Sequence, residues 1–261
     1  MGKVNAREKQ ILVELKKRGQ LESREIMELF RISESTARRM CVDLSKRGLA
    51  IRTFGGICCL PENSPSAAGY SYNVSETEHR DLKQRIGEYA SSLVKDGDVI
   101  FLNGGTTVQK MAEALIEHIR REGLKNISVL TNSIASAELL AADCTVMLTG
   151  GRLRRERRDM AGYLSEQMVR NAHFDKCFIG VDGINMNEGL MALDMDTATL
   201  DRMAVDQSDT AYILADSSKF NKTCFVTYAR FQSKHNIITD DQIPADLIDF
   251  AKEHGILMHV V

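Results

Sequence analysis

Five short polar segments, each directly after an apolar stretch, contain residue types that bind small anionic molecules. They are Asn103-Gly104-Gly105-Thr106-Thr107, Thr131-Asn132-Ser133, Gly150-Gly151, Asp182-Gly183, and Asp216 with Lys219. Glycines let the backbone turn sharply, so that N–H groups at the start of a following helix converge on an anion. Hydroxyl groups and a lysine add donors for a phosphate, and Asp and Asn suit sugar hydroxyl groups. The set predicts a site for a phosphorylated sugar.

These segments need a scaffold that brings them together. Apolar runs alternate with helical patterns along the second part of the chain, at 99–102, 127–131, 145–149, 177–181, 211–215, 223–227 and 237–239. Strands that are apolar throughout and separated by helices are typical of a mostly parallel sheet covered on both faces. Ligands bind at the carboxyl ends of the strands in such sheets. We therefore expect the five segments to line one pocket floor.

Two alternatives stay open for this part of the chain. An ordinary tight turn between a strand and a helix would also carry Gly104-Gly105, and no Gly-Lys-Ser/Thr follows at the spacing of a nucleoside triphosphatase loop. A sugar-phosphate isomerase or transferase is the alternative function, with Asp182 or Glu188 as base and Lys219 as electrostatic stabiliser. No histidine lies in the five segments, which argues against the enzyme.

A second group of residues, near the N-terminus, suits DNA. Ala37, Met40, Cys41 and Leu44 recur at the spacing of one helical face and predict a buried stripe. The first turns of this helix then present hydroxyl groups and two arginines outward, from Ser33, Ser35, Thr36, Arg38 and Arg39. A helix-turn-helix domain reads base edges with this part of its second helix, and arginine binds guanine in bidentate fashion. The alternative interpretations are a solvated helical hairpin or a protein-interaction arm.

The neighbouring segments complete a winged helix-turn-helix pattern. Helices are expected over about 6–18, from Ser23 and from Ser33, with each serine as the helix cap. Residues 49–57 are typical of a short β-ribbon, in which Gly55-Gly56 mark the end and Arg52 is placed to contact a phosphate or the minor groove. This pattern predicts a small DNA-binding domain ahead of the larger α/β domain.

Charge and composition place the domain boundaries. Residues 1–57 hold 13 Lys+Arg and 7 Asp+Glu, whereas the remainder has a net charge of −8. The basic part is the part expected to bind a polyanion. Residues 58–75 concentrate two of the three prolines with Ser, Asn and Gly and are predicted to be a linker. The expected domains are 1–57 for DNA and 76–261 for an effector.

Both halves resemble the DeoR family of bacterial transcriptional regulators. The family's Val/Ile-Ser turn, its Thr-Ile-Arg-Arg-Asp-Leu helix and its wing correspond to Ile32-Ser33, residues 36–41 (Thr-Ala-Arg-Arg-Met-Cys), and Arg52 with Gly55-Gly56. Its Asp-x-Gly-Thr-Thr, Thr-Asn-Ser, Gly-Gly, Gly-Ile and Asp-Ser-Ser-Lys segments correspond in order to 103–107, 131–133, 150–151, 183–184 and 216–219. Met40 and Asn103 replace aspartates of the family pattern.

The resemblance implies a fold and a function. The second domain would be similar in fold to ribose-5-phosphate isomerase, and the protein would be a regulator, most often a repressor, of a sugar-metabolism operon. Its partners would be an operator in double-stranded DNA, a phosphorylated sugar or related metabolite, and identical subunits. The linker and the helix around 77–94 are where we expect effector binding to be transmitted.

Three further features carry simpler interpretations. Five arginines lie within 152–158, where a solvated loop is preferred over a lid on an anionic ligand or a second DNA contact. The six cysteines lack Cys-x-x-Cys spacing and are expected to be reduced, and no metal-ligand or cofactor motif is present. No apolar run approaches the roughly 20 residues of a membrane span, and the first ten residues lack the apolar core of a secretion signal. We therefore expect a cytoplasmic protein.

Overall fold

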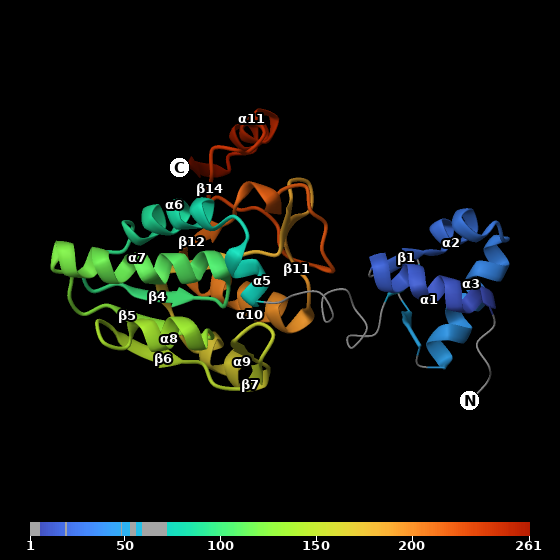
Figure 1. Cartoon of the computed structure of the whole chain (residues 1–261), viewed down its shortest axis with the longest axis horizontal. Helices are drawn as coiled ribbons and strands as arrows, with labels where there is room; N and C mark the ends of the chain where they lie inside the picture. Colours follow the sequence, from blue (N-terminus) through green and yellow to red (C-terminus); the bar gives the residue numbers. More distant parts are fainter. Residues whose placement is uncertain (1–5, 19, 48, 53–55, 59–71) are drawn as a thin grey trace. The chain divides into compact units, whose positions relative to one another are not determined.

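The computed structural model describes residues 6–18, 20–47, 49–52, 56–58 and 72–261, and the chain forms two compact units, Met1–Tyr70 and Ser71–Val261 (Figure 1). The predicted linker, 58–75, differs at both ends from what the structure places there. Cys58 ends a strand of unit 1, and Tyr72–Thr77 form helix α5 of unit 2. The residues between them, 59–71, lie outside the described part of the chain.

Unit 1 is a winged helix-turn-helix fold, as predicted. Its elements are α1 (Ala6–Arg18), β1 (Gln20–Glu22), α2 (Ser23–Phe30), α3 (Glu34–Lys46), β2 (Ile51–Arg52) and β3 (Gly56–Cys58). The stripes of the three helices meet in one core that includes Ile11, Ile26 and Leu44. The ribbon has a third strand that the sequence analysis missed, because β1 pairs antiparallel with β3 and gives the order β1-β3-β2.

Two residues of unit 1 differ from their predicted roles. Glu22, not Ser23, caps α2, and it does so in a reciprocal pair with Glu25, whose carboxylate accepts from the Glu22 amide at 2.8 Å. Ser23 is the first residue of the helix and is buried. Gly56 packs against β1, where a Cβ atom would overlap the carbonyl oxygen of Leu21. The close approach of β3 to β1 therefore requires glycine at this position.

Unit 2 is built on a seven-stranded sheet in which every neighbouring pair is parallel, in the order β15-β14-β12-β9-β4-β5-β6. The strands are β4 (Val99–Leu102), β5 (Ser128–Thr131), β6 (Thr145–Leu148), β9 (Phe174–Gly180), β12 (Ser208–Leu214), β14 (His235–Thr239) and β15 (Leu257–Val260). The predicted runs coincide with these strands within a few residues, except 223–227. That run overlaps β13 (Val226–Ala229), which belongs to a separate antiparallel sheet.

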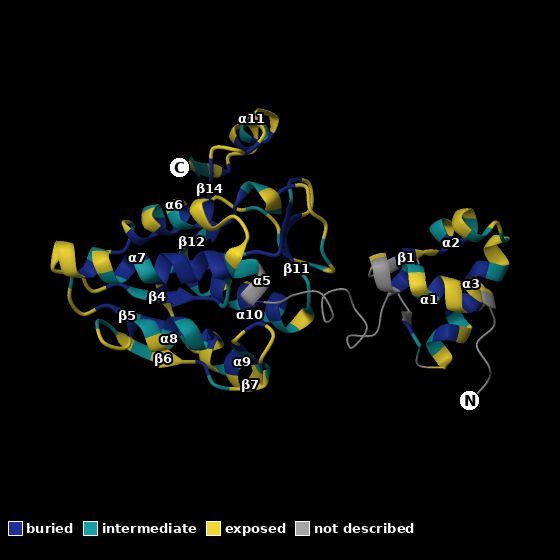
Figure 2. Ribbon diagram, in the orientation of Figure 1, coloured by how far each residue is buried: buried dark blue, intermediate teal, exposed yellow. Residues whose placement is uncertain are grey.

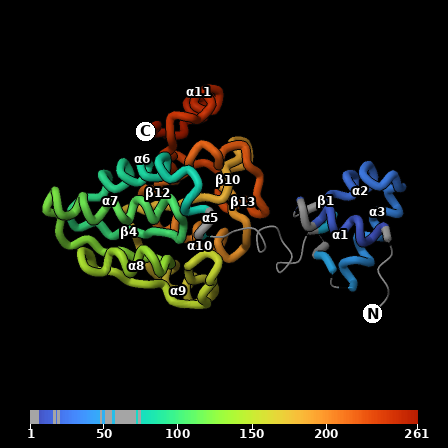
Figure 3. The backbone as a smooth tube through the Cα atoms, viewed as in Figure 1, coloured from blue at the N-terminus to red at the C-terminus, as the bar shows by residue number. Residues whose placement is uncertain are grey.

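Helices cover both faces of the main sheet (Figure 1, Figure 2 and Figure 3). One core lies under α6 (Arg80–Ser91), α7 (Thr106–Glu122) and α8 (Ile134–Leu140). The other lies under α9 (Tyr163–Arg170), α10 (Met195–Asp206) and α11 (Ala245–Glu253). Successive strand residues alternate between these cores, since Ile100 and Leu102 face the first and Phe101 faces the second. Both faces of the central strands are therefore buried, which explains why these strands appear in the sequence as continuous apolar runs.

Two small antiparallel elements stand beside the main sheet. The first is the sheet β10-β11-β13, formed by Gly183–Asn185, Gly189–Ala192 and Val226–Ala229. The second is a hairpin of β7 (Arg152–Arg154) and β8 (Asp159–Ala161), which contains the arginine-rich segment. We call residues 152–161 the arginine hairpin. It links the strand-end segment that follows β6, Gly150-Gly151, to α9.

Candidate DNA interface and effector site

The start of α3 gathers the predicted hydroxyl groups. Ser33 caps the helix, because its Oγ accepts from the Thr36 amide at 3.4 Å. The same Oγ lies 2.9 Å from Thr36 Oγ1 and 3.1 Å from Ser35 Oγ. The three hydroxyl groups therefore form one polar cluster at the positive end of the helix, where a phosphate is favoured.

The two arginines of α3 stand on its exposed face. Arg38 makes a solvent-exposed ion pair with Glu34 at 3.6 Å, a contact that costs little to break. Arg39 is exposed and has no ion-pair partner in the described part of the chain. Met40 is buried in the core of unit 1, so the residue that replaces the family's aspartate fills an apolar position. The two arginines therefore lie on the exposed face of α3 within unit 1.

The three predicted wing residues, Arg52, Gly55 and Gly56, differ in where the structure places them. Arg52 lies in β2 and pairs with Ile57 across the ribbon, which places its backbone at the base of the wing. Gly55 lies outside the described residues. Gly56 is buried against Leu21 and offers no surface to a partner, so its role is in packing and we leave it out of the proposed DNA interface.

The five predicted effector segments all lie at the end of the main sheet where the carboxyl ends of the strands meet. They follow β12, β9, β4, β5 and β6, which are five consecutive neighbours in the sheet. Because all of these strands are parallel, their carboxyl ends meet at the same edge. Tertiary structure thus brings together residues that are more than 100 positions apart in the sequence.

The turn after β4 begins α7. Gly105 is the N-cap residue of this 17-residue helix and no side chain caps it, which leaves the first-turn N–H groups available. Thr106 and Thr107 are buried beside them. Gly104 has a second role, since a Cβ atom there would lie 2.8 Å from Cβ of Asp159 in the arginine hairpin. Glycine at 104 therefore lets the hairpin approach the strand ends.

The side chain of Asn103 is hydrogen-bonded to other groups of unit 2. Its Nδ2 donates to the Gly180 carbonyl at 3.0 Å and to the Asp201 carboxylate at 3.1 Å, and its Oδ1 accepts from the Gly180 amide at 2.9 Å. These bonds join the end of β4 to β9 and to α10. Burial raises the pKa of Asp201 to about 8, against the opposing hydrogen bond from Asn103. Asn103 thus holds β4, β9 and α10 together at the predicted site.

In the segment after β5, most polar groups make hydrogen bonds within unit 2 and one buried oxygen is left without a partner. Thr131 accepts from the Ser133 amide at 3.0 Å, and Ser133 caps α8 by accepting from the Ser136 amide at 3.2 Å. Asn132 donates to the Met160 carbonyl at 3.0 Å. The buried Oδ1 of Asn132 has no hydrogen-bond partner within the described residues. An unsatisfied acceptor of this kind suits a hydroxyl group of a ligand.

The arginine hairpin buries two of its five arginines and is therefore not a fully solvated loop. Arg154 is 9% exposed and binds Asp159 in bidentate fashion at 2.8 and 2.7 Å, and it also reaches Asp194 at 2.8 Å. Arg157 is equally buried and lies 3.4 Å from Asp182 and 3.6 Å from Asp194. The preferred interpretation of this segment was therefore wrong for two of its five arginines. Their burial requires paired carboxylates, which the strand ends and α10 supply.

These five side chains form what we call the Arg/Asp cluster. It holds two cations and three anions, from Arg154, Arg157, Asp159, Asp182 and Asp194. Burial raises the pKa of Asp159, whereas for Asp194 the nearby Arg154 and Arg157 outweigh burial and lower the pKa. Sequence reasoning found only Asp182 of the five. The available signal was the position of the arginines directly after Gly150-Gly151.

The opposite side of the site carries lysines. Asp216 is fully buried, and its Oδ1 accepts from the Ser218 amide at 3.1 Å, while its Oδ2 has no partner in the described part of the chain. Lys219 is half-buried and makes no ion pair within the described residues. Lys83 of α6, which the sequence analysis missed, donates to the carbonyls of Ser75 and Glu78 at 2.6 and 2.8 Å. Burial lowers the pKa of Lys83, and the charge of Asp216 opposes this effect.

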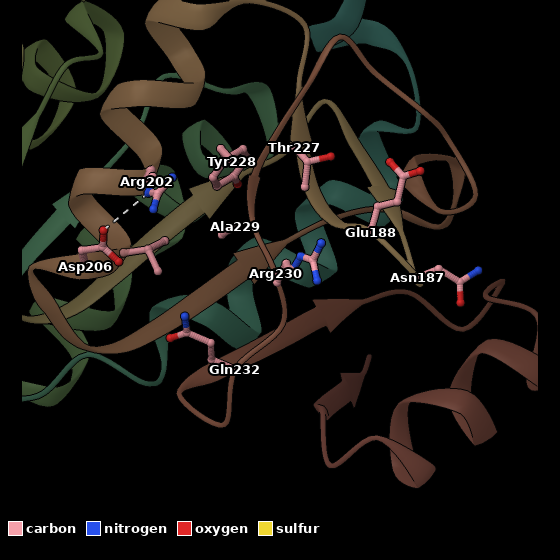
Figure 4. Close-up of a pocket in the computed structure, with 10 residues that line it drawn as sticks. Asn187, Glu188, Arg202, Asp206, Thr227, Tyr228, Ala229, Arg230 and Gln232 are labelled. Carbon is pink, nitrogen blue, oxygen red and sulfur yellow. Dashed lines mark ion pairs between the residues drawn. The ribbon is translucent and has the colours of Figure 1, made fainter. Parts of the chain in front are cut away.

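A groove of about 670 Å³ lies elsewhere, between α10 and the small sheet (Figure 4). Its walls carry charges of both signs, from Glu188, Arg202, Asp206 and Arg230. Arg202 and Asp206 form an exposed ion pair at 3.8 Å. No predicted effector residue lines this groove, which is separate from the candidate effector site at the strand ends. Glu188, the alternative catalytic base, lies in this groove rather than at those ends.

Other chemistries find little support in the described residues. No group of three or more His, Cys, Asp or Glu side chains there is arranged to hold a metal ion. Within the same residues, no helix combines the length and apolar character of a membrane span. Cys144, Cys177 and Cys224 are free thiols, and burial raises the pKa of Cys177 to about 12.

Comparison with known families accounts for both units. Residues 7–61 match the DeoR-like helix-turn-helix domain, and residues 78–241 match the DeoR C terminal sensor domain. The two matches lie in the order of the two compact units.

Two transcriptional repressors are similar in sequence to this chain over nearly its whole length. The HTH-type transcriptional repressor GlcR of Bacillus subtilis (strain 168) is 32% identical over 244 residues, which cover 92% of this chain and 90% of that protein. The Glycerol-3-phosphate regulon repressor of Escherichia coli (strain K12) is 25% identical over 252 residues, or 95% of this chain and 96% of that protein. Among solved structures, ribose 5-phosphate isomerase A from Methanocaldococcus jannaschii aligns over 55% of each chain at 21% identity and a TM-score of 0.42.

Proposed function

This chain belongs to the DeoR family of transcriptional regulators, and on that premise we propose that it represses a sugar-metabolism operon and releases its operator when a phosphorylated sugar binds unit 2. The family assigns a helix-turn-helix domain and a sensor domain, so the enzyme alternative does not apply. The observation that carries the proposal is the convergence of the five polar segments on one sheet edge, in a chain that also has an exposed recognition helix.

The chemistry of the strand ends favours a phosphorylated sugar as effector. The uncapped first turn of α7 and the side chain of Lys219 supply donors and positive charge for a phosphate. Asn132, Asp182 and Asp216 supply acceptors for sugar hydroxyl groups. One relative is named for the glycerol-3-phosphate regulon, which is consistent with a phosphorylated effector.

The operator contacts that we propose come from α3 and the wing. Arg39 and Arg38 would reach base edges, while the hydroxyl cluster of Ser33, Ser35 and Thr36 would hold a phosphate. Arg52 would contact the backbone beside them. Two copies of the chain, acting in the cytoplasm, would read the two halves of an inverted repeat.

A route between the two functions starts at the arginine hairpin. The Tyr72 amide donates to the Glu156 carbonyl at 2.9 Å, and the guanidinium of Arg158 lies 5.2 Å from the Tyr72 ring centroid. Tyr72 is 3% exposed and is the first described residue after 59–71, through which the chain continues to unit 1. An effector that moves the hairpin would therefore move the point where unit 2 receives the chain from the DNA-binding unit.

Binding to DNA from upstream of its own gene, with and without a panel of sugar phosphates, tests this function. We expect low-salt binding that one compound weakens, because phosphate contacts are strongest at low salt. Absence of DNA binding under every condition would contradict the operator proposal. DNA binding that no phosphorylated compound changes would contradict the effector proposal.

Replacing Lys219 tests the phosphate contact. Lys219→Met should leave operator affinity in the free protein unchanged and weaken the effector by about ten- to a hundredfold, as expected for a charged hydrogen bond of about 1.5–3 kcal/mol. Lys222→Met is the matched control, since Lys222 is an exposed lysine three residues away. Titration calorimetry with the active sugar phosphate measures both. Equal effector affinity in the two variants would remove Lys219 from the site.

Replacing Tyr72 tests the coupling route. Tyr72→Ala should keep operator and effector binding while reducing the change in operator affinity that the effector causes, which typically corresponds to about 1–3 kcal/mol. Operator titrations at zero and saturating effector give this difference. Full coupling in the variant, with circular dichroism showing a folded chain, would rule out the route through α5.

A further inference from the structure

A buried carboxyl group lies directly behind the turn that begins α7. We call residues 103–107, which form this turn and the start of the helix, the effector loop. Asp201 of α10 is 2% exposed, and its two oxygens lie 3.1 and 3.2 Å from Asn103 Nδ2. The function proposed above gives this carboxyl group no role, although it is hydrogen-bonded to the first residue of the loop.

Asp201 lies on the apolar side of its helix. Its neighbours one turn away, Ala198, Ala204 and Val205, all belong to the core under α10. A carboxylate in such surroundings needs several hydrogen-bond donors, because burying an unpaired charge is costly. Within the described residues the one donor to Asp201 is Asn103 Nδ2, which is shared between the two carboxyl oxygens. The surroundings therefore favour the neutral, protonated form of Asp201.

The charged and titratable groups near Asp201 come from the arginine hairpin, from β9 and the residues after it, and from β13. They are Arg154, Arg157, Cys177, Asp182 and Tyr228. Burial is the largest effect on Asp201 and raises its pKa to about 8, with a further increase from Asp182 and opposing effects of the two arginines. Burial also raises the pKa of Cys177 and of Tyr228, so both keep their protons at this pH. Asp201 is therefore the member of this group that changes charge slightly above neutral pH.

Asn103 connects this carboxyl group to the effector loop. Its Oδ1 accepts from the Gly180 amide and its Nδ2 donates to the Gly180 carbonyl, so the amide group is held in one orientation. A Cβ atom on Gly105, the N-cap residue of α7, would lie 3.8 Å from Asn103 Oδ1. One side chain therefore separates Asp201 from the first turn of α7, where we place the phosphate. A charge on Asp201 would act on an anion bound there.

We propose that Asp201 is a positioning residue of the effector site, and that the phosphate of the effector binds the form of the protein in which Asp201 carries its proton. The proposal rests on the function above, because it needs an anionic effector at the first turn of α7. A phosphate group carries close to two negative charges above neutral pH, and it disfavours the ionised form of a nearby carboxyl group. Effector binding would therefore take up a proton wherever Asp201 is ionised in the free protein.

This linkage makes the response to the effector depend on pH. Because the effector-bound protein holds its proton more tightly than the free protein, effector affinity falls as the pH rises through the pKa of Asp201 in the free protein, about 8. A like charge nearby changes the proton affinity of a carboxyl group by about tenfold or more. Effector affinity should then fall by at least about threefold between about pH 7 and about pH 9.

Titration calorimetry of the full chain tests this dependence, with inorganic phosphate and the panel of sugar phosphates as the injected compounds. Asp201→Asn keeps an acceptor for Asn103 but cannot ionise, so its affinity for a compound that binds should lose the threefold fall that the natural chain shows. Asp206→Asn is the matched control, because Asp206 is exposed on the same helix, and it should keep the full pH dependence. Equal pH dependence in the natural chain and in Asp201→Asn would overturn the proposal and assign the effect to other groups, such as Lys219.

A second measurement needs no variant. Repeating the titration of the natural chain at about pH 8.5 in Tris and in EPPS, two buffers with different enthalpies of ionisation, gives the number of protons taken up on binding. The phosphate itself contributes little there, because its second pKa is about 6. Binding without proton uptake would overturn the role of Asp201 and leave the proposed function standing. A panel in which no compound binds, inorganic phosphate included, would contradict the proposed effector and this inference together.

Discussion

Replacing Arg154 with Met should destabilise unit 2 by about 3–5 kcal/mol, the usual loss when one member of a buried ion pair is removed. The guanidinium makes a bidentate bond to Asp159 and a third contact to Asp194, and all of these groups are wholly or largely buried. Methionine fills a similar volume, so the expected loss comes from carboxylates left without a cation. Urea unfolding of the full chain, followed by circular dichroism, measures it.

The matched control lies next to it in the hairpin. Arg155 is exposed, and Arg155→Met should change the free energy of unfolding by no more than about 0.5 kcal/mol. Adding Asp159→Asn to Arg154→Met removes one of the carboxylates left without a cation, and it should recover part of the lost free energy of unfolding. A double variant that is less stable than Arg154→Met alone would show that the packing of the arginine, not its charge, matters.

The loss should also depend on pH. Burial already raises the pKa of Asp159, and without Arg154 its pKa in the folded state would rise further. A carboxylate with a raised folded pKa keeps its proton longer in the folded than in the unfolded state, so stability falls as pH rises above the ordinary Asp pKa of about 3.9. The difference between Arg154→Met and the natural chain should therefore widen from acidic to neutral pH. A gap that is constant over this range would contradict the charge argument.

Replacing Arg39 with Ala should weaken operator binding by about ten- to a hundredfold and relax the sequence preference at one base pair, equivalent to about 1–3 kcal/mol. Arg39 is exposed on the first two turns of α3, on the side opposite the buried stripe of Ala37 and Leu44. Its removal leaves no buried group unpaired, so the fold should be unaffected. Fluorescence anisotropy with the upstream fragment and single-base variants of it measures both effects.

The control for Arg39 is on the same helix. Lys46 lies in the last turn of α3 and is exposed, about two turns from Arg39. Lys46→Ala should change affinity little, and equally for every sequence, because a lysine at that end can contact only the phosphate backbone. If both variants lose the same affinity on all DNA sequences, Arg39 contributes only charge and does not read a base.

Local sequence patterns were sufficient to predict the main helices and strands and the fold class of both units. The stripe of Ala37, Met40, Cys41 and Leu44 predicts α3 and its exposed face because helix periodicity is a property of neighbouring residues. The continuous apolar runs predict the parallel sheet because both of its faces are buried. Position after a strand then indicates which residues lie at the carboxyl ends of the strands, even though the strand order is not known from the sequence.

The partners of individual side chains depended on the tertiary structure. In the sequence, Asn103 and Gly104 are both members of a polar turn. In the structure, Asn103 makes hydrogen bonds to Gly180 and Asp201, whereas the absence of a side chain at Gly104 leaves room for Asp159 of the hairpin. The arginines at 154 and 157 read as part of a solvated run until the fold sets Asp182 and Asp194 beside them.

By itself, then, the sequence predicted a helix-turn-helix domain with an exposed polar helix face, and a sheet whose strand ends carry residue types suited to phosphates and sugars. Only the tertiary structure decided that Arg154 and Arg157 turn inward and that the Tyr72 amide is hydrogen-bonded to the hairpin. The physical reason is that ion pairing and burial depend on groups far apart in the chain. Helix and strand patterns depend on groups a few residues apart, and those are visible before folding.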